Sequence, residues 1–389
     1  MKNDTKLIHL GRGEPGQEGT VNLPIHRAST IVYSNVASYL SRFDGERRYR
    51  AITYGANGTH NARALADAVS ELEGGYGTVV TGTGLSAITM TLAALTRSGD
   101  HILVTDSVYG PTRKFCDTVL TRYRVETTYY PPAADISGLL RPNTKLVFTE
   151  APGSLTFEMQ DIPAITESVH AHGALVVMDN TWGTPLFFKP IEHGVDVSIQ
   201  AGTKYIAGHS DLVIGMITAD DEAIYRQLFD ATRSFGDVAG PDDCYLALRG
   251  FRTLGVRLRQ QQENALIVAQ WLHDRDEVEQ VLYPPLPSDP GHAIWQRDFA
   301  GAASVFGVTL KTADSSAIEA MVNHLGLFQI GSSWGGYESL VAVNKTPLER
   351  AHVHWDHVPL LLRLHVGLED PGDLIADLEA GFERLNGKS

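Results

Sequence analysis

The feature that most constrains the fold is an alternation, starting near residue 59, between short apolar runs and longer stretches with helical spacing. The stretch NARALADAVSELEG places apolar residues three and four positions apart and stops at Gly74, as an amphipathic helix does. The apolar runs that follow lie at 79–80, 102–104, 146–148, 175–178, 197–199 and 212–217. Apolar strands separated by amphipathic helices predict an α/β fold with a mostly parallel sheet covered on both faces.

The pattern changes toward both ends of the chain. The periodic stretch 245–274 predicts one linking helix, and the run 305–310 with the segments SSAIEAMVNHLG and GDLIADLEAGFERL predicts a smaller α+β unit. Residues 1–58 show little helical period. We therefore expect an extended N-terminal arm over 1–58 that contacts a neighbouring subunit, a large domain over 59–247 and a C-terminal α+β domain over 248–389.

The turn GTGLSA, residues 82–87, connects an apolar strand to a helix. Free N–H groups at a helix start, with no bulky side chains nearby, make an anion site. The same letters fit a dinucleotide fingerprint, but no acidic residue closes a second strand about 20 residues further on. A plain strand-to-helix turn is the other alternative.

Two ionisable residues follow predicted strand ends. Asp179 comes directly after the apolar run of ALVVMD, at the edge where open α/β sheets bind ligands; the alternative is a helix cap or turn. Lys204, in QAGTKYIAGHSD, follows the next apolar run. A free lysine has a pKa of about 10.4 and reacts poorly at neutral pH, whereas desolvation lowers the pKa and favours an imine with a carbonyl. A buried, ion-paired lysine is the alternative for Lys204.

Together these three features are the parts that pyridoxal 5′-phosphate requires. The turn would take the phosphate, Asp179 would keep the pyridine nitrogen protonated, and Lys204 would hold the aldehyde as a Schiff base.

Longer motifs carry a family resemblance from about residue 6 to residue 385. These motifs are DVSIQAGTKYIAGHSD, MDNTW, YGANGT, SWGGYESL and LRLHVGLEDPGDLIADLEAGF. On them the chain resembles the Cys/Met-metabolism family of pyridoxal-phosphate enzymes, and within it the bacterial cystathionine β-lyases. The resemblance implies the aspartate-aminotransferase-like fold type I, with 59–247 as the pyridoxal-phosphate-binding domain.

The resemblance also implies a role for each site residue. Lys204 would form the Schiff base and Asp179 would pair with the pyridine nitrogen. Gly84, Leu85 and Thr203 would contact the phosphate, and Tyr109 would stack on the cofactor ring and take part in catalysis. Tyr54 of a neighbouring subunit would contact the phosphate or the substrate and also take part in catalysis. Arg363 would clamp the substrate carboxylate, and Ser333 and Trp334 would line the same pocket. A planar guanidinium suits the carboxylate clamp because it binds bidentately.

The activity implied is that of a carbon–sulfur β-lyase of methionine biosynthesis by transsulfuration. It would cleave L-cystathionine or related cysteine S-conjugates to homocysteine or another thiol, pyruvate and ammonia. The bulky Trp334 favours this reaction because γ-acting members usually have a small aliphatic residue there. The alternatives are a γ-lyase, γ-replacement or racemase on the same scaffold, an NAD(P)-dependent oxidoreductase built on GTGLSA, and a cofactor-binding protein without turnover.

The sequence departs from the family pattern at two positions. Ala56 stands where the family usually has an arginine that contacts the phosphate across the dimer interface, and Ala201 stands where relatives often have a phosphate-binding serine. A charge-assisted contact of about 1.5–3 kcal/mol is thereby lost. Arg48, Arg50 and Arg113 are the candidates to replace it.

Composition narrows the partners and the compartment. A net charge of −14 argues against nucleic acid and anionic membranes as partners. The family resemblance implies a small amino-acid substrate and a homodimer or homotetramer. Only two cysteines, without a CxxC motif, and a start without an apolar segment indicate a cytoplasmic protein. The histidines of HVHWDH (352, 354 and 357) have ligand spacing, but no acidic or cysteine cluster accompanies them, so we expect a polar loop and no metal.

Overall fold

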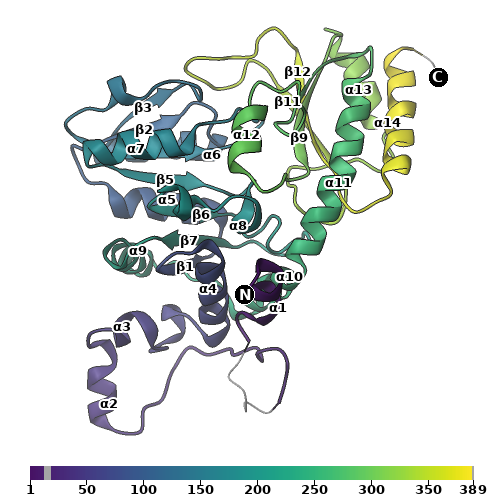
Figure 1. Ribbon diagram of the computed structural model, residues 1–389. Coiled ribbons are helices and arrows are strands. Elements are labelled where there is room, and N and C mark those ends of the chain that lie inside the picture. Colours follow the sequence, from purple (N-terminus) through teal and green to yellow (C-terminus); the bar gives the residue numbers. More distant parts are fainter. Residues whose placement is uncertain (13–18, 388–389) are drawn as a thin grey trace.

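Two β-sheets organise the computed structural model, which describes residues 1–12 and 19–387 (Figure 1). The larger sheet has seven strands in the order β1-β7-β6-β5-β4-β2-β3. Its strands are β1 (Gly77–Thr81), β2 (His101–Thr105), β3 (Glu126–Tyr130), β4 (Thr144–Glu150), β5 (Leu175–Asp179), β6 (Val197–Gln200) and β7 (Gly215–Ala219).

Strand direction in this sheet brings the polar strand ends together. Strands β2 to β6 pair in parallel, and β7 pairs antiparallel with both β6 and β1. Strand β1 therefore runs in the same direction as β6, and six of the seven strands have their carboxyl ends at one edge. The segments that follow β1, β5 and β6 at this edge are the GTGLSA turn, Asp179 and the loop of Lys204.

Helices cover both faces of the sheet, as the alternation predicts. Helices α4 (His60–Glu73) and α7 (Ile162–His172) pack on one face, and α5 (Gly84–Leu95), α6 (Gly110–Thr118) and α9 (Glu222–Ser234) pack on the other. In β5, Val176 and Met178 belong to the first core and Val177 to the second. The mostly parallel α/β architecture is thus confirmed.

Local signals fix the ends of the predicted helices. The Thr59 hydroxyl accepts a hydrogen bond from the N–H of Ala62 and caps α4, which ends at Gly74 with φ 78°. In the same way, the carboxylate of Asp161 caps α7, which ends at Gly173 with φ 84°.

Three elements differ from the sequence prediction. The single helix predicted over 245–274 is two helices, α10 (Pro241–Arg252) and α11 (Leu254–His273), because the chain turns at Thr253 from the large sheet toward the small one. Strand β3 was not predicted, because as an edge strand with partly exposed residues it has no apolar run. The strand predicted over 212–217 begins at Gly215.

The smaller sheet has five strands in the order β10-β11-β12-β9-β8. Helices α11, α13 (Ser315–Asn323) and α14 (Pro371–Leu385) pack beside it, as expected of an α+β unit. Its strands are β8 (Val278–Leu282), β9 (Val305–Leu310), β10 (Gln329–Ile330), β11 (Leu340–Lys345) and β12 (Leu360–His365). Two further helices are α8 (Thr184–Phe187), which follows β5 of the large sheet, and α12 (His292–Asp298), which lies between β8 and β9 in the sequence.

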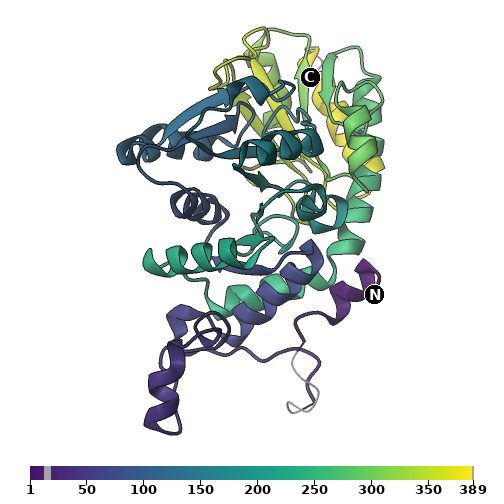
Figure 2. The same cartoon turned by 60° about the vertical axis from the view of Figure 1, so that its left-hand side comes forward.

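The N-terminal segment, predicted as an extended arm, contains three short α-helices among its described residues, and only part of it leaves the body of the chain. Helix α1 (Asn3–His9) packs on α4, α10 and α11, whereas α2 (Val36–Leu40) and α3 (Arg47–Arg50) project below the large sheet (Figures 1 and 2). Residues 13–18 of the predicted arm lie outside the described residues. Among the helices described, none combines the length and apolar character needed to cross a membrane.

We predict that Gly250→Ala destabilises the fold. A Cβ at Gly250 in α10 would lie 2.2 Å from the carbonyl oxygen of Ala207 and 2.6 Å from that of Ile206, so backbone must move. Such overpacking costs about 1–3 kcal/mol, measurable as a lower midpoint of chemical unfolding. Gly138→Ala is the matched control, because no atom lies within 4 Å of the added Cβ. Equal midpoints for the two variants would contradict the prediction.

Candidate active site

A cavity of about 260 Å³ lies at the carboxyl edge of the large sheet, where residues from the small-sheet region close it. It gathers side chains from segments far apart in the sequence. Eight of the predicted site residues line it: Gly84, Leu85, Tyr109, Asp179, Thr203, Lys204, Trp334 and Arg363. The hydroxyl of Ser333, a ninth, accepts a hydrogen bond from the amine of Lys204 at 2.8 Å.

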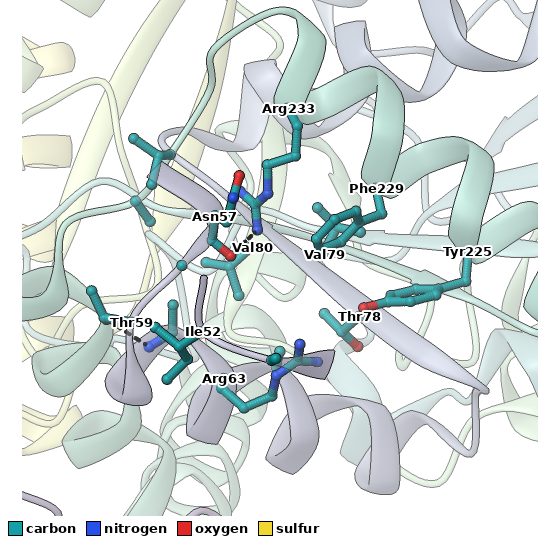
Figure 3. Close-up of a pocket in the computed structure, with 16 residues that line it drawn as sticks. Ile52, Asn57, Thr59, Arg63, Thr78, Val79, Val80, Tyr225, Phe229 and Arg233 are labelled. Atoms are coloured by element: carbon teal, nitrogen blue, oxygen red, sulfur yellow. Dashed lines mark hydrogen bonds between the residues drawn. The ribbon is translucent and has the colours of Figure 1, made fainter. Parts of the chain in front are cut away.

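A second cavity lies between the arm, α4, β1 and α9, and Figure 3 shows its lining. Arg63 and Arg233 border it, and Nη2 of Arg233 donates to the carbonyl oxygen of Asn57 at 2.9 Å. Its volume of about 30 Å³ holds about one or two water molecules. The larger cavity is therefore the candidate active site.

The start of α5 forms an anion cradle in the large cavity. The hydroxyl of Thr83 caps the helix by accepting from the N–H of Ser86 at 2.8 Å. The N–H groups of Gly84 and Leu85 belong to the first turn, where a helix provides no acceptor. A Cβ at Gly84 would lie 2.5 Å from the Cβ of Ala201, so glycine allows the helix start to approach the lysine loop. The hydroxyl of Thr203 lines the cavity and accepts from the N–H of Ile214 at 2.9 Å.

Asp179 presents one carboxylate oxygen to the cavity. Its Oδ1 accepts from the N–H of Thr181 at 3.0 Å and from the hydroxyl of Thr181 at 2.6 Å. No donor among the described residues reaches Oδ2. Burial raises the pKa of Asp179, while the bonds from Thr181 and the nearby Lys204 act in the opposite direction. Oδ2 can therefore accept a hydrogen bond from an N–H or O–H group of a bound molecule.

Lys204 is a buried amine with a lowered pKa. Burial is the largest cause, the charge of Arg363 adds to it, and Asp179 opposes both, so that the pKa falls to about 8. The amine lies 5.4 Å from the ring centroid of Trp334. The lowered pKa increases the share of molecules that carry a neutral, nucleophilic amine near neutral pH.

Arg363 enters the cavity from β12 of the small sheet. Its Nη2 donates to the carbonyl oxygens of Ser332 at 2.6 Å and Ser333 at 3.2 Å. Burial lowers its pKa to about 10, so the guanidinium is still charged at neutral pH. Among the described residues Nη1 has no partner, which leaves it available for a carboxylate.

Sequence reasoning missed Glu150, although a signal was present. Glu150 ends β4 just as Asp179 ends β5, and the two residues are register partners across the sheet. Its Oε2 accepts from the N–H of Tyr109 at 2.8 Å, which fixes the start of α6. Burial, and then the charge of Asp179, raise the pKa of Glu150 well above its ordinary value. Thr181 was also missed, because only the folded chain shows that it holds Asp179.

Tyr54 and the candidate replacement arginines lie elsewhere. Tyr54 is exposed on the arm and does not line the cavity. Arg113 forms a buried ion pair with Asp106 at 2.5 Å, and Arg48 pairs with Asp230 at 2.8 Å. Arg50 lies over the ring of Tyr76. None of these arginines lines the cavity formed by this chain.

The histidines of HVHWDH belong to a loop between β11 and β12. A ring nitrogen of His352 lies 3.0 Å from the carbonyl oxygen of Tyr129. Within residues 1–12 and 19–387, no three His, Cys, Asp or Glu side chains are placed to hold a metal ion.

Comparison with known proteins decides the family. The model of the Cys/Met metabolism PLP-dependent enzymes matches residues 4–383. The chain belongs to this family. It is 46% identical to a putative cystathionine beta-lyase of Rhizobium johnstonii, over 97% of this chain and 95% of the relative, and 40% identical to cystathionine beta-lyase MetC of Escherichia coli, over 99% of each.

Two further similarities widen the range of activities. An L-alanine/L-glutamate racemase of Wolbachia pipientis is 38% identical over 99% of this chain and 98% of the relative. A crystal structure of cystathionine gamma synthase from Xanthomonas oryzae has a TM-score of 0.89 and 31% identity, with complete coverage of both chains.

The chain is therefore a pyridoxal-phosphate-dependent carbon–sulfur lyase of fold type I that acts on an amino acid. The cavity fits this cofactor by its own chemistry. It offers an anion cradle at α5, a carboxylate oxygen of Asp179 without a protein donor, and an amine at Lys204 whose pKa is lowered.

We predict that the apo-protein binds pyridoxal phosphate covalently at a rate that rises with pH to a midpoint near 8. The neutral amine of Lys204 is the reactive form, and its pKa is about 8. Arg363→Met should move the midpoint to higher pH, because the charge of Arg363 lowers this pKa. Stopped-flow absorption at a series of pH values measures both. Lys311→Ala is the control, because Lys311 is exposed and its loss should leave the midpoint unchanged. A wild-type midpoint near the pKa of a free lysine, about 10.4, would contradict the assignment of Lys204 as the reactive amine.

Proposed function

We propose that the chain is a β-lyase that cleaves L-cystathionine, or a related cysteine S-conjugate, to homocysteine or another thiol, pyruvate and ammonia. The observation that carries the proposal is the convergence of Lys204, Asp179 and Arg363 on one cavity that Trp334 also lines. Lys204 would accept a proton from the substrate, Asp179 would pair with the ring nitrogen of the cofactor, and Arg363 would bind the carboxylate of the substrate.

Binding and orientation come from groups on both sheets. The amides of Gly84 and Leu85 and the hydroxyl of Thr203, which line the cavity, would hold the phosphate of the cofactor, and Tyr109 would supply an aromatic ring for its pyridine ring. Arg363 binds the α-carboxylate of the substrate with the N–H groups that the protein leaves free. When bound, pyridoxal phosphate stabilises negative charge at the substrate Cα, and Asp179 supports this by keeping the ring nitrogen protonated.

Proton movement is assigned to Lys204 and Tyr109. With a pKa of about 8, the amine of Lys204 can accept the Cα proton near neutral pH. Burial, followed by the charges of Asp179 and Glu150, raises the pKa of Tyr109, so its hydroxyl keeps its proton. Either Tyr109 or protonated Lys204 then donates a proton to the departing sulfur.

Trp334 favours β-elimination, because an indole in the cavity limits the space for the leaving group.

A second candidate is racemisation, which the name of the Wolbachia relative supports. It needs the same removal of the Cα proton by Lys204 but returns a proton to Cα rather than expelling a thiol. A γ-reaction is the third, since the structural neighbour is a cystathionine gamma synthase.

The arm supports a proposal about assembly. Val36 and Leu40 of α2 are 72% and 67% exposed, and Tyr54 is 49% exposed. We propose that the projecting part of the 1–58 arm, with α2 and α3, packs on a neighbouring subunit of a homodimer or homotetramer, where Tyr54 reaches the other active site. We also propose a cofactor-binding domain over 59–247, a C-terminal domain over 248–389 and a cytoplasmic location without nucleic-acid or membrane partners.

We predict that the purified holoenzyme forms pyruvate and homocysteine from L-cystathionine. Lys204→Ala should lower kcat by about 10²–10⁴-fold, as loss of a general base does, while exposed Lys311→Ala should not. Mass spectrometry identifies the keto acid and the thiol.

The other products identify the alternatives. Release of 2-oxobutyrate and cysteine would replace the proposal with γ-elimination. Loss of optical rotation of L-alanine or L-glutamate without keto acid would replace it with racemisation.

A further inference from the structure

One wall of the large cavity has an unusual backbone. Gly153, Ser154, Leu155 and Phe157 line it. Leu155 has φ 69° and Phe157 has φ 55°, both in the left-handed region that large side chains rarely adopt. Such a segment persists only where the surroundings hold it.

Arg350 is the side chain that holds this wall. Its side chain is 5% exposed, and its Nη1 donates to Oε1 of Glu158 at 2.8 Å. Its Nη2 donates to the carbonyl oxygen of Ser154 at 3.2 Å and to the hydroxyl of Thr156. That hydroxyl in turn donates to Oε2 of Glu158. The guanidinium of Arg350 therefore contacts three alternate residues of the segment 154–158, namely Ser154, Thr156 and Glu158.

Arg350 belongs to the loop between β11 and β12, which extends from the small sheet toward β2 and β3 (Figure 1). The residues after it dock on the large-sheet region. The N–H groups of Ala351 and His352 donate to the two carboxylate oxygens of Asp106 at 2.8 and 2.9 Å. Arg113 pairs with the same carboxylate. The position of Arg350 is thus set by a contact between the two sheet regions.

The wall faces the substrate space of the site. Leu155, Phe157 and Trp334 supply large apolar side chains to the cavity that contains Lys204. Apolar walls select among substrates by the size of the group that fits between them. Movement of 153–157 would therefore change the space for the leaving thiol without removing any group that handles the proton or the carboxylate.

We propose that Arg350 is a positioning residue that fixes the 153–157 wall and thereby sets the size of the thiol group that the site accepts. This inference rests on the proposed function, because it takes the large cavity to be the site where the substrate binds. Among the described residues, Arg350 hydrogen-bonds only Ser154, Thr156 and Glu158 and reaches neither the Lys204 amine nor Arg363, so its effect must act through the wall.

The first test is substrate selection by the holoenzyme. Arg350→Met removes all three contacts, and Arg350→Lys retains the charge but not the span between Nη1 and Nη2. The ratio of kcat/KM for L-cystathionine to that for S-methyl-L-cysteine should change about tenfold or more in Arg350→Met and less in Arg350→Lys. Arg297→Met is the control, because Arg297 also pairs with an acid, Asp161, but makes no hydrogen bond to residues 153–158. An equal loss on both substrates would overturn the proposal.

The second test does not depend on activity. Amide hydrogen exchange of the apo-protein should be faster at 153–157 in Arg350→Met and unchanged in α7. Unchanged exchange at 153–157 would overturn the proposal. If Arg350→Met does not fold, Glu158→Gln weakens the same network and should change both readouts in the same direction. If the wild type cleaves neither substrate, the proposed function fails, while faster exchange at 153–157 would still support the role of Arg350 in holding the wall.

Discussion

The site depends on an amine that is buried without a full counter-charge. Lys204 lies where desolvation and Arg363 both disfavour its protonated form, and Asp179 offsets only part of this. A buried lysine that keeps its proton would need a close carboxylate, and it would then be a poor nucleophile. The fold therefore has to hold the amine near an acid but not paired with it. The loop around Lys204 is held by the guanidinium of Arg257, which donates to the carbonyl oxygens of Tyr205 and Ile206. Gly250, which has no Cβ, lets α10 pack closely on Ala207 in the same loop.

The direction of the strands in the large sheet places the other polar groups of the cavity around that amine. Because six strands end at one edge, a glycine turn, two carboxylates and the lysine meet there although 120 residues separate Gly84 from Lys204. The small sheet then brings Arg363 and Trp334 to the same edge. Neither region forms the cavity by itself, since the large-sheet region contributes Lys204 and Asp179 and the small-sheet region contributes Arg363 and Trp334.

The sequence predicts those parts of the site that lie next to a strand or helix end. Asp179, Lys204 and the GTGLSA turn carry this signal, and so does Glu150, which was overlooked. Thr181, by contrast, acts by hydrogen-bonding a residue two positions away, which no periodicity reveals. Arg350 is 192 residues from Glu158, and only the packing of one sheet region on the other brings them together. Strand β3 and the turn at Thr253 escaped prediction for a similar reason, because an edge position and a change of direction leave no apolar pattern. The role of Tyr54 stays a prediction, because it concerns a second subunit.

The contact between Gly84 and Ala201 has a consequence for how this enzyme can evolve. With 2.5 Å between the Cβ of Ala201 and the place where a Cβ of residue 84 would stand, the two positions share space for only one side chain. Their substitutions are therefore epistatic. Glycine at position 201 would relieve only part of the clash, because a Cβ at residue 84 would still lie 3.0 Å from the Cα of residue 201, so the backbone must move as well. The exposed arm has no such constraint. The cradle and the lysine loop must change together or stay as they are.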